Sequence, residues 1–106
     1  MSLETVGLWI DHSRAVILFP GSLTAHLVEP GSQDPGRYYD DVIEVLGAPR
    51  PLLIMGPGRA KDELRERMAR IMTRRREARE WVVEVETAES MTTPQIVATL
   101  SNRLAS

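Results

Sequence analysis

The stretch Leu52–Met68, LLIMGPGRAKDELRERM, restricts the fold more than any other part of the sequence. Leu52–Met55 is apolar at every position and lacks the alternation of a strand with one solvated face. A continuous apolar run bounded by turn residues is typical of a parallel strand covered on both faces. Gly56-Pro57-Gly58 ends the run, and a helical pattern begins directly after it. The stretch therefore predicts a strand–helix unit, and its strand needs a crossover connection to a parallel neighbour.

The residues before this stretch predict a meander of three short antiparallel strands. Val6–Ile10 and Ala15–Phe19 are apolar runs joined by a polar turn at residues 11–14. Leu23–Val28 follows the turn Pro20-Gly21 and alternates, so that most of its apolar residues fall on one face. Alternation of this kind indicates a strand at the edge of the sheet, and short runs separated by tight turns are typical of a meander.

A first helix is predicted after a loop rich in glycine and proline. Apolar residues recur at helical spacing from Tyr39 to Leu46. Asp34 and Pro35 suit the N-cap and the first helical position. Gly47 stands where a glycine ends many helices, so we expect the helix to stop there.

Two more helices and one more strand are predicted downstream. The second helix runs from about Arg59 to the low seventies, and Thr93 caps the third helix, which starts at Pro94. Trp81–Glu86 is a strand with Glu84 and Glu86 alternating outward, which makes it the second edge candidate. The apolar stripes of the two helices are Ala60, Leu64, Met68, Ile71 and Met72, and Ile96, Val97, Leu100 and Leu104.

The predicted order is β-β-β-α-β-α-β-α. The 106 residues suffice for one compact core and are too few for two, so we expect a single domain over residues 1–106. With the third and fifth strands at the edges, the sheet order 3-2-1-4-5 follows. We therefore predict an α/β fold of the ribonuclease-H-like type, a mixed five-stranded sheet with helices on both faces.

Composition excludes several classes of protein. The sequence has no cysteine, which excludes a disulfide framework and thiolate chemistry. Its first residues lack the basic lead and apolar run of a signal peptide, and no apolar stretch approaches the ~20 residues of a membrane span. We expect a cytoplasmic protein without a membrane partner.

Positive charge is concentrated in one segment of the chain. Residues 59–79 carry nine basic and four acidic side chains, a net charge of +5, so the rest of this chain of net charge −2 carries −7. A basic segment on an otherwise acidic protein is a candidate RNA-binding surface. The alternative is a solvated helix face with ion pairs four residues apart, such as Glu63–Arg67 and Glu66–Arg70. The predicted RNA- or ribosome-binding residues are Lys61, Arg67, Arg70, Arg74, Arg75, Arg76 and Arg79.

The turn Gly56-Pro57-Gly58 precedes a helix N-terminus, where backbone N–H groups and the macrodipole favour anions. The spacing is not that of a P-loop, and Pro57 removes one amide donor that a phosphate cradle would use. We therefore interpret the turn as a plain strand-to-helix connection, and we expect no nucleotide or other small-molecule cofactor.

No set of residues in the sequence establishes an enzyme. Asp11 follows the first strand, where ribonuclease-H-like nucleases carry a metal-binding aspartate, and Asp40, Asp41 and Glu44 are candidates to complete such a site. Two-metal chemistry needs several converging carboxylates, and the strand Leu52–Met55 ends without one. We expect Asp11 to hydrogen-bond its own turn and expect no bound metal, because neither histidine has metal-ligand spacing.

Aromatic side chains are interpreted mainly as packing residues. Trp9 alternates with its neighbours and is expected beneath a helix on the opposite face of the sheet. Tyr39 lies on the apolar stripe of the first helix, whereas we expect Tyr38 to be freer to meet a partner.

The motif at Gly56-Pro57-Gly58, followed by the pair Lys61-Asp62, resembles the middle domain of the archaeal and eukaryotic peptide-chain release factor and its relative Pelota. Val82–Leu100, VVEVETAESMTTPQIVATL, resembles the final strand and helix of that domain. The stretch VGLWIDHSRAVILF, residues 6–19, resembles its opening hairpin. Among the members of this superfamily, the chain is most similar to short, stand-alone bacterial proteins of the translational-machinery type.

The resemblance implies a ribonuclease-H-like fold and an association with the ribosome or its RNA. Peptide release in that family depends on a Gly-Gly-Gln tripeptide on a long loop before the first helix. In this sequence the loop is short, and Gln33 follows Gly31-Ser32 instead. The resemblance therefore does not imply peptidyl-tRNA hydrolysis.

Three hypotheses follow. The first is a non-enzymatic protein that binds the ribosome or structured RNA through its basic segment. The second is an interaction or regulatory module that forms a homodimer through the edge strand at Trp81–Glu86 or Leu23–Val28. The third is an enzyme, either a metal-dependent nuclease at Asp11 or a residual esterase at Gln33.

Overall fold

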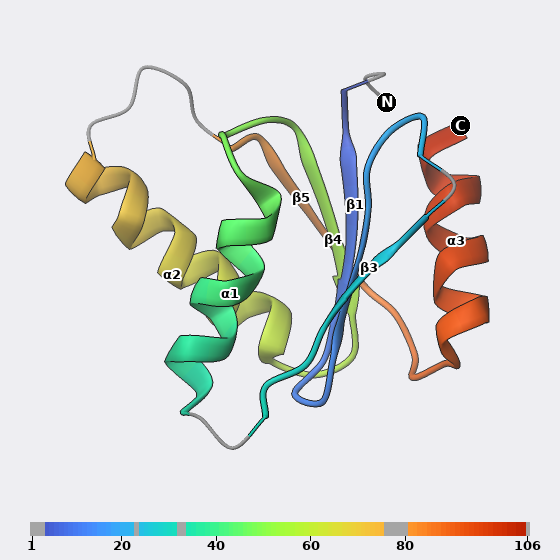
Figure 1. The fold of residues 1–106 in the computed structure, drawn as a ribbon, viewed down its shortest axis with the longest axis horizontal. Coiled ribbons are helices and arrows are strands. Elements are labelled where there is room, and N and C mark those ends of the chain that lie inside the picture. The colour runs from blue at the N-terminus through green and yellow to red at the C-terminus, as the bar shows by residue number, and fades with distance from the viewer. Residues whose placement is uncertain (1–3, 23, 32–33, 76–80, 106) are drawn as a thin grey trace.

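The computed structural model of the chain describes residues 4–22, 24–31, 34–75 and 81–105, which form five strands and three helices in the predicted order (Figure 1). The strands are β1 (Val6–Ile10), β2 (Ala15–Leu18), β3 (His26–Val28), β4 (Leu52–Gly56) and β5 (Val83–Thr87). The helices are α1 (Pro35–Leu46), α2 (Ala60–Arg75) and α3 (Thr93–Ala105).

The five strands form one mixed sheet in the order β3-β2-β1-β4-β5, which confirms the predicted fold class and sheet order. β1 is antiparallel to β2 and parallel to β4, and β5 is parallel to β4. β2 and β3 complete the antiparallel part of the sheet. The two predicted edge strands, β3 and β5, are the edges.

Both edge strands differ in extent from the prediction. β3 begins at His26, after Thr24 and Ala25, which were predicted to belong to the strand; Leu23, the predicted first residue, lies outside the described residues. The Ser22 hydroxyl donates to the Thr24 carbonyl at 3.1 Å and accepts from the Thr24 amide at 3.2 Å. Those contacts use backbone groups of Thr24 in a turn. β5 runs two residues later at its start and one later at its end than predicted, because its register follows β4 from Leu52 to Gly56.

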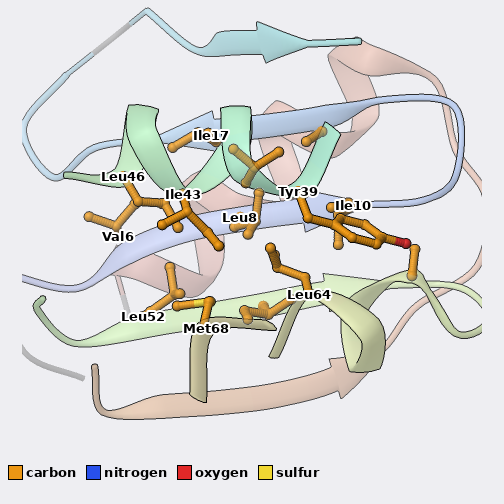
Figure 2. Packing of buried hydrophobic residues seen from close by; sticks show 14 of the residues in the cluster. Val6, Leu8, Ile10, Ile17, Tyr39, Ile43, Leu46, Leu52, Leu64 and Met68 are labelled. Carbon is orange, nitrogen blue, oxygen red and sulfur yellow. The ribbon is translucent and has the colours of Figure 1, made fainter. Parts of the chain in front are cut away.

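Helices cover both faces of the sheet, as predicted: α1 and α2 lie on one face and α3 lies on the other (Figure 1). Figure 2 shows how β1 directs Val6, Leu8 and Ile10 toward α1 and α2, where they meet Ile43 and Leu64. The strand alternation sends Trp9 to the opposite face. Trp9 packs there with Ile96 and Leu100 of α3, which confirms its expected place beneath a helix.

The helix ends follow the sequence signals closely. The Asp34 carboxylate accepts a hydrogen bond from the Arg37 amide at 3.0 Å, and Gly47 ends α1 with φ of 74°. The N-cap of α3 is Thr92, one residue before the predicted cap at Thr93. The Thr92 hydroxyl accepts from the Gln95 amide while the Gln95 side chain accepts from the Thr92 amide, the reciprocal arrangement of a capping box.

In the described part of the chain, no helix is long and apolar enough to cross a membrane.

Candidate functional site

One end of the sheet gathers the residues that the sequence singled out. The carboxyl ends of β1, β4 and β5 lie there together with the N-termini of all three helices, at the lower edge of Figure 1. In open α/β sheets, ligands bind beyond the carboxyl ends of parallel strands. The candidate site therefore begins at this end of the sheet and extends along α2 away from it.

Gly56 explains the Gly-Pro-Gly turn that joins β4 to α2. Its φ is 150°, and a Cβ atom at this position would lie 2.1 Å from the carbonyl oxygen of Ile10. No side chain fits at that distance. Gly58 also has a positive φ, 63°, but a Cβ there would meet nothing within 4 Å. The first glycine is thus required by packing against β1, and the second by backbone conformation alone.

Lys61 lies inside this turn rather than on the surface where the sequence placed it among the RNA-binding residues. The residue is 5% exposed, and its ammonium group donates a hydrogen bond to the Gly58 carbonyl. The Lys61 side chain therefore stabilises the turn through a hydrogen bond to the backbone of the turn itself. Its geometry suits a structural role in the motif, and the ammonium group is not presented to a phosphate backbone.

A hydrogen-bonded network joins the turn between β1 and β2 to α1 and α2, beside the Gly-Pro-Gly turn. Glu63 contacts His12 Nε2 at 3.2 Å and accepts a hydrogen bond from the Tyr39 hydroxyl at 3.0 Å. The hydrogen bond to His12, together with that from Tyr39, lowers the pKa of Glu63. Burial and the hydrogen bond to Glu63 raise the pKa of Tyr39 to about 12, so its hydroxyl stays protonated and remains a donor at neutral pH.

Asp11 serves its own turn, as predicted. One carboxylate oxygen accepts hydrogen bonds from the amides of Ser13 and Arg14 at 2.7 and 2.8 Å. Tyr38 is 2% exposed, and its hydroxyl donates to the Asp11 carbonyl at 2.9 Å, so the expectation that Tyr38 is free to meet a partner is wrong. Burial raises the pKa of Tyr38 as well.

The carboxylates considered for a nuclease do not converge. Asp40 pairs with Arg67, and Asp41 pairs with Arg37 one turn away. No group of three potential metal-ligating side chains forms among the residues that the structure describes. Gln33, considered for an esterase, lies outside the described residues.

Arg67 joins α2 to α1 instead of forming the predicted pair with Glu63. Its Nε and Nη2 atoms donate to the two carboxylate oxygens of Asp40 at 2.6 and 2.8 Å, a bidentate arrangement between residues far apart in sequence. This hydrogen bonding lowers the pKa of Asp40 and raises that of Arg67. Arg67 is thus engaged within the protein, whereas the predicted pair of Arg70 with Glu66 is present at a long 3.9 Å.

The outer face of α2 becomes more basic toward its C-terminal end. Arg70 and Arg74 lie one turn apart, both exposed, and Arg74 has no ion-pair partner among the described residues. Arg65 is also exposed, on the preceding turn. Arg75 is the last residue of α2, and Arg76 and Arg79 lie outside the described residues. Of the predicted binding residues whose side chains the structure describes, Arg70 and Arg74 therefore face solvent.

Sequence reasoning missed an arginine that connects the first hairpin to α3. The Arg14 guanidinium donates to Thr93 Oγ1 at 3.1 Å and to the Met91 carbonyl, and it lies 5.5 Å from the centre of the Trp9 ring. The alternation of the strand predicted the position of Trp9, but no local pattern pairs residue 14 with a loop more than 70 residues later.

A groove between α1 and α2 was also missed. It has a volume of about 580 Å³ and lies at the end of the helices opposite the Gly-Pro-Gly turn. The lining residues are Asp40, Ile43, Glu44, Gly47, Ala48, Pro49 and Ile71. Its lining combines the C-terminal half of α1, the loop that follows it and Ile71 of α2, so the groove depends on how the two helices pack rather than on a local motif.

The strand order and the turn define an α/β fold of the ribonuclease-H-like type, with a Gly-Pro-Gly connection between β4 and α2. No protein-family model matches the sequence, and a comparison with curated proteins gives no match. Among solved structures, the chain is similar to the crystal structure of Pelota from Archaeoglobus fulgidus, with a TM-score of 0.56 and 19% sequence identity. The similarity covers 94% of this chain and 31% of the archaeal chain.

At this level of identity, the similarity to Pelota concerns the fold. It confirms the expected likeness to the Pelota fold over nearly the whole chain. This chain spans about a third of the length of the archaeal protein, so the activity and partners of the longer protein do not pass to it directly.

Proposed function

We propose that this chain is a non-enzymatic, cytoplasmic protein that associates with the ribosome or with structured RNA, and that it is a short bacterial relative of the release-factor and Pelota middle domain. The observation that carries the proposal is the pair of exposed arginines, Arg70 and Arg74, on a helix that ends at Arg75; Arg76 and Arg79 follow in the sequence. The similarity in fold to Pelota supports a role connected with translation.

The proposed contact is electrostatic. Arg70 and Arg74 are separated by one helical turn, so both guanidinium groups can contact phosphates along one strand of nucleic acid. No acidic residue lies between Glu66 and Glu77 in the sequence, and a backbone phosphate would meet little repulsion there. Arg75, Arg76 and Arg79 extend the proposed surface along the chain.

Arg74, in the last turn of α2, also stabilises the helix, because a cation near a helix C-terminus interacts favourably with the macrodipole. A binding experiment separates the two roles. We expect the protein to co-sediment with purified ribosomes at low salt and to lose affinity as salt rises, because each neutralised phosphate releases counterions. Affinity that stays constant between low and moderate salt would contradict the proposed mechanism.

Variants of single charges locate the contact. Arg74→Gln is expected to weaken binding and to reduce the slope of log affinity against log salt by about 0.7–0.9, the value for one lost phosphate contact. Arg37→Gln is the matched control, because Arg37 is an exposed arginine near the start of α1, whereas Arg74 lies near the end of α2; these two helix ends lie apart in Figure 1. Equal effects of the two substitutions would show that net charge, and not the α2 surface, controls binding.

The triple variant Arg74→Glu/Arg75→Glu/Arg76→Glu tests the whole basic run. We expect it to abolish pelleting at salt concentrations where the wild type binds. Circular dichroism of the variant is required alongside, so that loss of binding is not caused by loss of α2. Full binding by a folded triple variant would rule out this surface.

A further inference from the structure

The outer edge of β5 is the longer of the two free sheet edges. β5 has five residues and β3 has three, and no strand of the described chain lies beyond β5. The Leu52 amide donates to the Val82 carbonyl at 2.9 Å, and the Ala88 amide donates to the Gly56 carbonyl at 3.1 Å. These two bonds anchor the ladder between β4 and β5 at both ends.

The register then determines which backbone groups of β5 point outward. In a parallel ladder, alternate residues direct both backbone groups to the same neighbour. Since Val82 and Ala88 bond to β4, Glu84 and Glu86 do the same, and the N–H and C=O groups of Val83, Val85 and Thr87 point to the outer edge. A row of such groups is a template for one more strand.

The side chains of β5 divide between two faces of different character. Val83 and Val85 are half-buried and pack against the α1/α2 core, leaving part of their apolar surface open. Glu84 is exposed on the opposite face and has no ion-pair partner among the described residues. Glu86 lies on that same face and pairs with Arg103 of α3. Val82, just before the strand, is 67% exposed.

Charge argues against a second copy of the chain on this edge. An antiparallel pair of β5 strands centred on Val85 would place Glu84 opposite Glu86 of the other copy. Centring the pair on Glu84 or on Glu86 places a glutamate opposite itself. Each of these twofold arrangements brings carboxylates together, and like charges directly opposite each other in a sheet are destabilising.

We propose that the outer edge of β5 binds an extended peptide segment of another protein, in which basic residues alternate with apolar ones. The peptide backbone pairs with the outward groups of Val83, Val85 and Thr87, which is strand addition at a sheet edge. Its apolar side chains extend the surface of Val83 and Val85, and its basic side chains face Glu84. This inference does not depend on the basic surface of α2 or on RNA.

The experiment uses two blocked synthetic heptapeptides, one alternating valine with lysine and one alternating valine with glutamate. Each is titrated into the isotopically labelled full chain, and amide hydrogen exchange and chemical shifts are followed by NMR. We expect the lysine peptide to bind and to protect the Val83, Val85 and Thr87 amides, which otherwise point outward. We expect the glutamate peptide to leave them unprotected.

Two controls separate backbone pairing from attraction of charge. A lysine peptide with N-methyl groups on alternate amides keeps its charge but loses the donors for pairing. With this peptide, the wild-type protein is expected to show no protection of the three amides. Glu84→Gln is expected to weaken binding of the lysine peptide by about two- to fivefold, which is the effect of losing one exposed charge pair. Glu44→Gln, which removes an exposed carboxylate of α1, is expected to leave binding unchanged.

Several results would overturn the proposal. One is equal binding of the lysine peptide and its N-methylated form, and another is protection of the three amides by the glutamate peptide. A third is failure of the lysine peptide to perturb β5. Protection of the same amides without peptide, with a doubled mass in sedimentation, would replace the proposed peptide with a second copy of this chain.

Discussion

Gly56 shows how a single backbone position determines the β4–α2 turn. A Cβ atom there would overlap the Ile10 carbonyl oxygen at 2.1 Å, and the φ of 150° disfavours any other residue. We predict that Gly56→Ala lowers the free energy of unfolding by about 3 kcal/mol or more. Gly58→Ala is the control, because it adds a Cβ to open space at φ 63°, at an expected cost of about 1–2 kcal/mol. Similar losses in urea unfolding for both variants would contradict this account.

The bidentate pair of Asp40 and Arg67 makes stability depend on pH. Hydrogen bonds from Arg67 lower the pKa of Asp40 in the folded state. A carboxyl with a lowered folded pKa stabilises the protein above its unfolded pKa, and the contribution is lost as pH falls through the folded value. We predict that Asp40→Asn is less stable than the wild type at pH 7 and that the difference shrinks below about pH 4, near the ordinary pKa of aspartate.

Urea unfolding between pH 7 and pH 2 measures this difference directly. Glu44→Gln is the matched control, because Glu44 is an exposed carboxylate on the same helix, without an ion-pair partner among the described residues. A stability difference for Asp40→Asn that is constant over the whole range would show that the ion pair does not contribute.

At the scale of secondary structure, α3 depends on its capping box. Thr92 and Gln95 satisfy each other's amides at the N-terminus, and Pro94 supplies no amide of its own. We predict that Thr92→Ala lowers the free energy of unfolding by about 1 kcal/mol. Ser101→Ala, at an exposed position of the same helix, should change it by less than about 0.5 kcal/mol. Thermal unfolding followed by circular dichroism compares the two.

The elements that the sequence predicted correctly are those with strong local signals. Apolar runs, a capping aspartate, a terminal glycine and the Gly-Pro-Gly turn are sufficient for the order of strands and helices and for the sheet order. The ends of β3 and β5 were predicted less well. Strand ends depend on the partner strand and on turn contacts such as those of Ser22, and a hydropathy pattern does not predict such contacts.

The candidate site was harder to predict because its contacts are long-range. Helical spacing placed Arg67 beside Glu63, but the folded chain brings Asp40 within reach. Spacing likewise left Tyr38 outside the apolar stripe, and its buried hydroxyl finds the Asp11 carbonyl at the end of β1. Lys61 looked like a surface cation, and only the geometry of the turn reveals the carbonyl that it contacts. Sequence therefore identified the basic segment but not which of its cations remain exposed.

At the scale of the whole molecule, the residues that the structure describes form two apolar clusters, one on each face of the sheet. Trp9 belongs to the cluster beneath α3, and Leu64 belongs to the cluster beneath α1 and α2. Alternate residues of β1 and β4 serve both clusters, so loss of packing on one face removes the support of the strands for the other. We therefore expect the two faces to unfold together rather than as separate units.

Leu64→Ala in a Trp81→Phe background tests this coupling, because Trp9 is then the sole tryptophan and its fluorescence reports the opposite face. Leu64 is fully buried, and its truncation should lower the free energy of unfolding by about 2–5 kcal/mol. We predict that the urea midpoints of Trp9 fluorescence and of circular dichroism shift together by the same amount. A Trp9 transition that stays at its original midpoint while the circular dichroism transition moves would mean that the sheet does not transmit the loss, and that α3 and its cluster fold independently of α1 and α2.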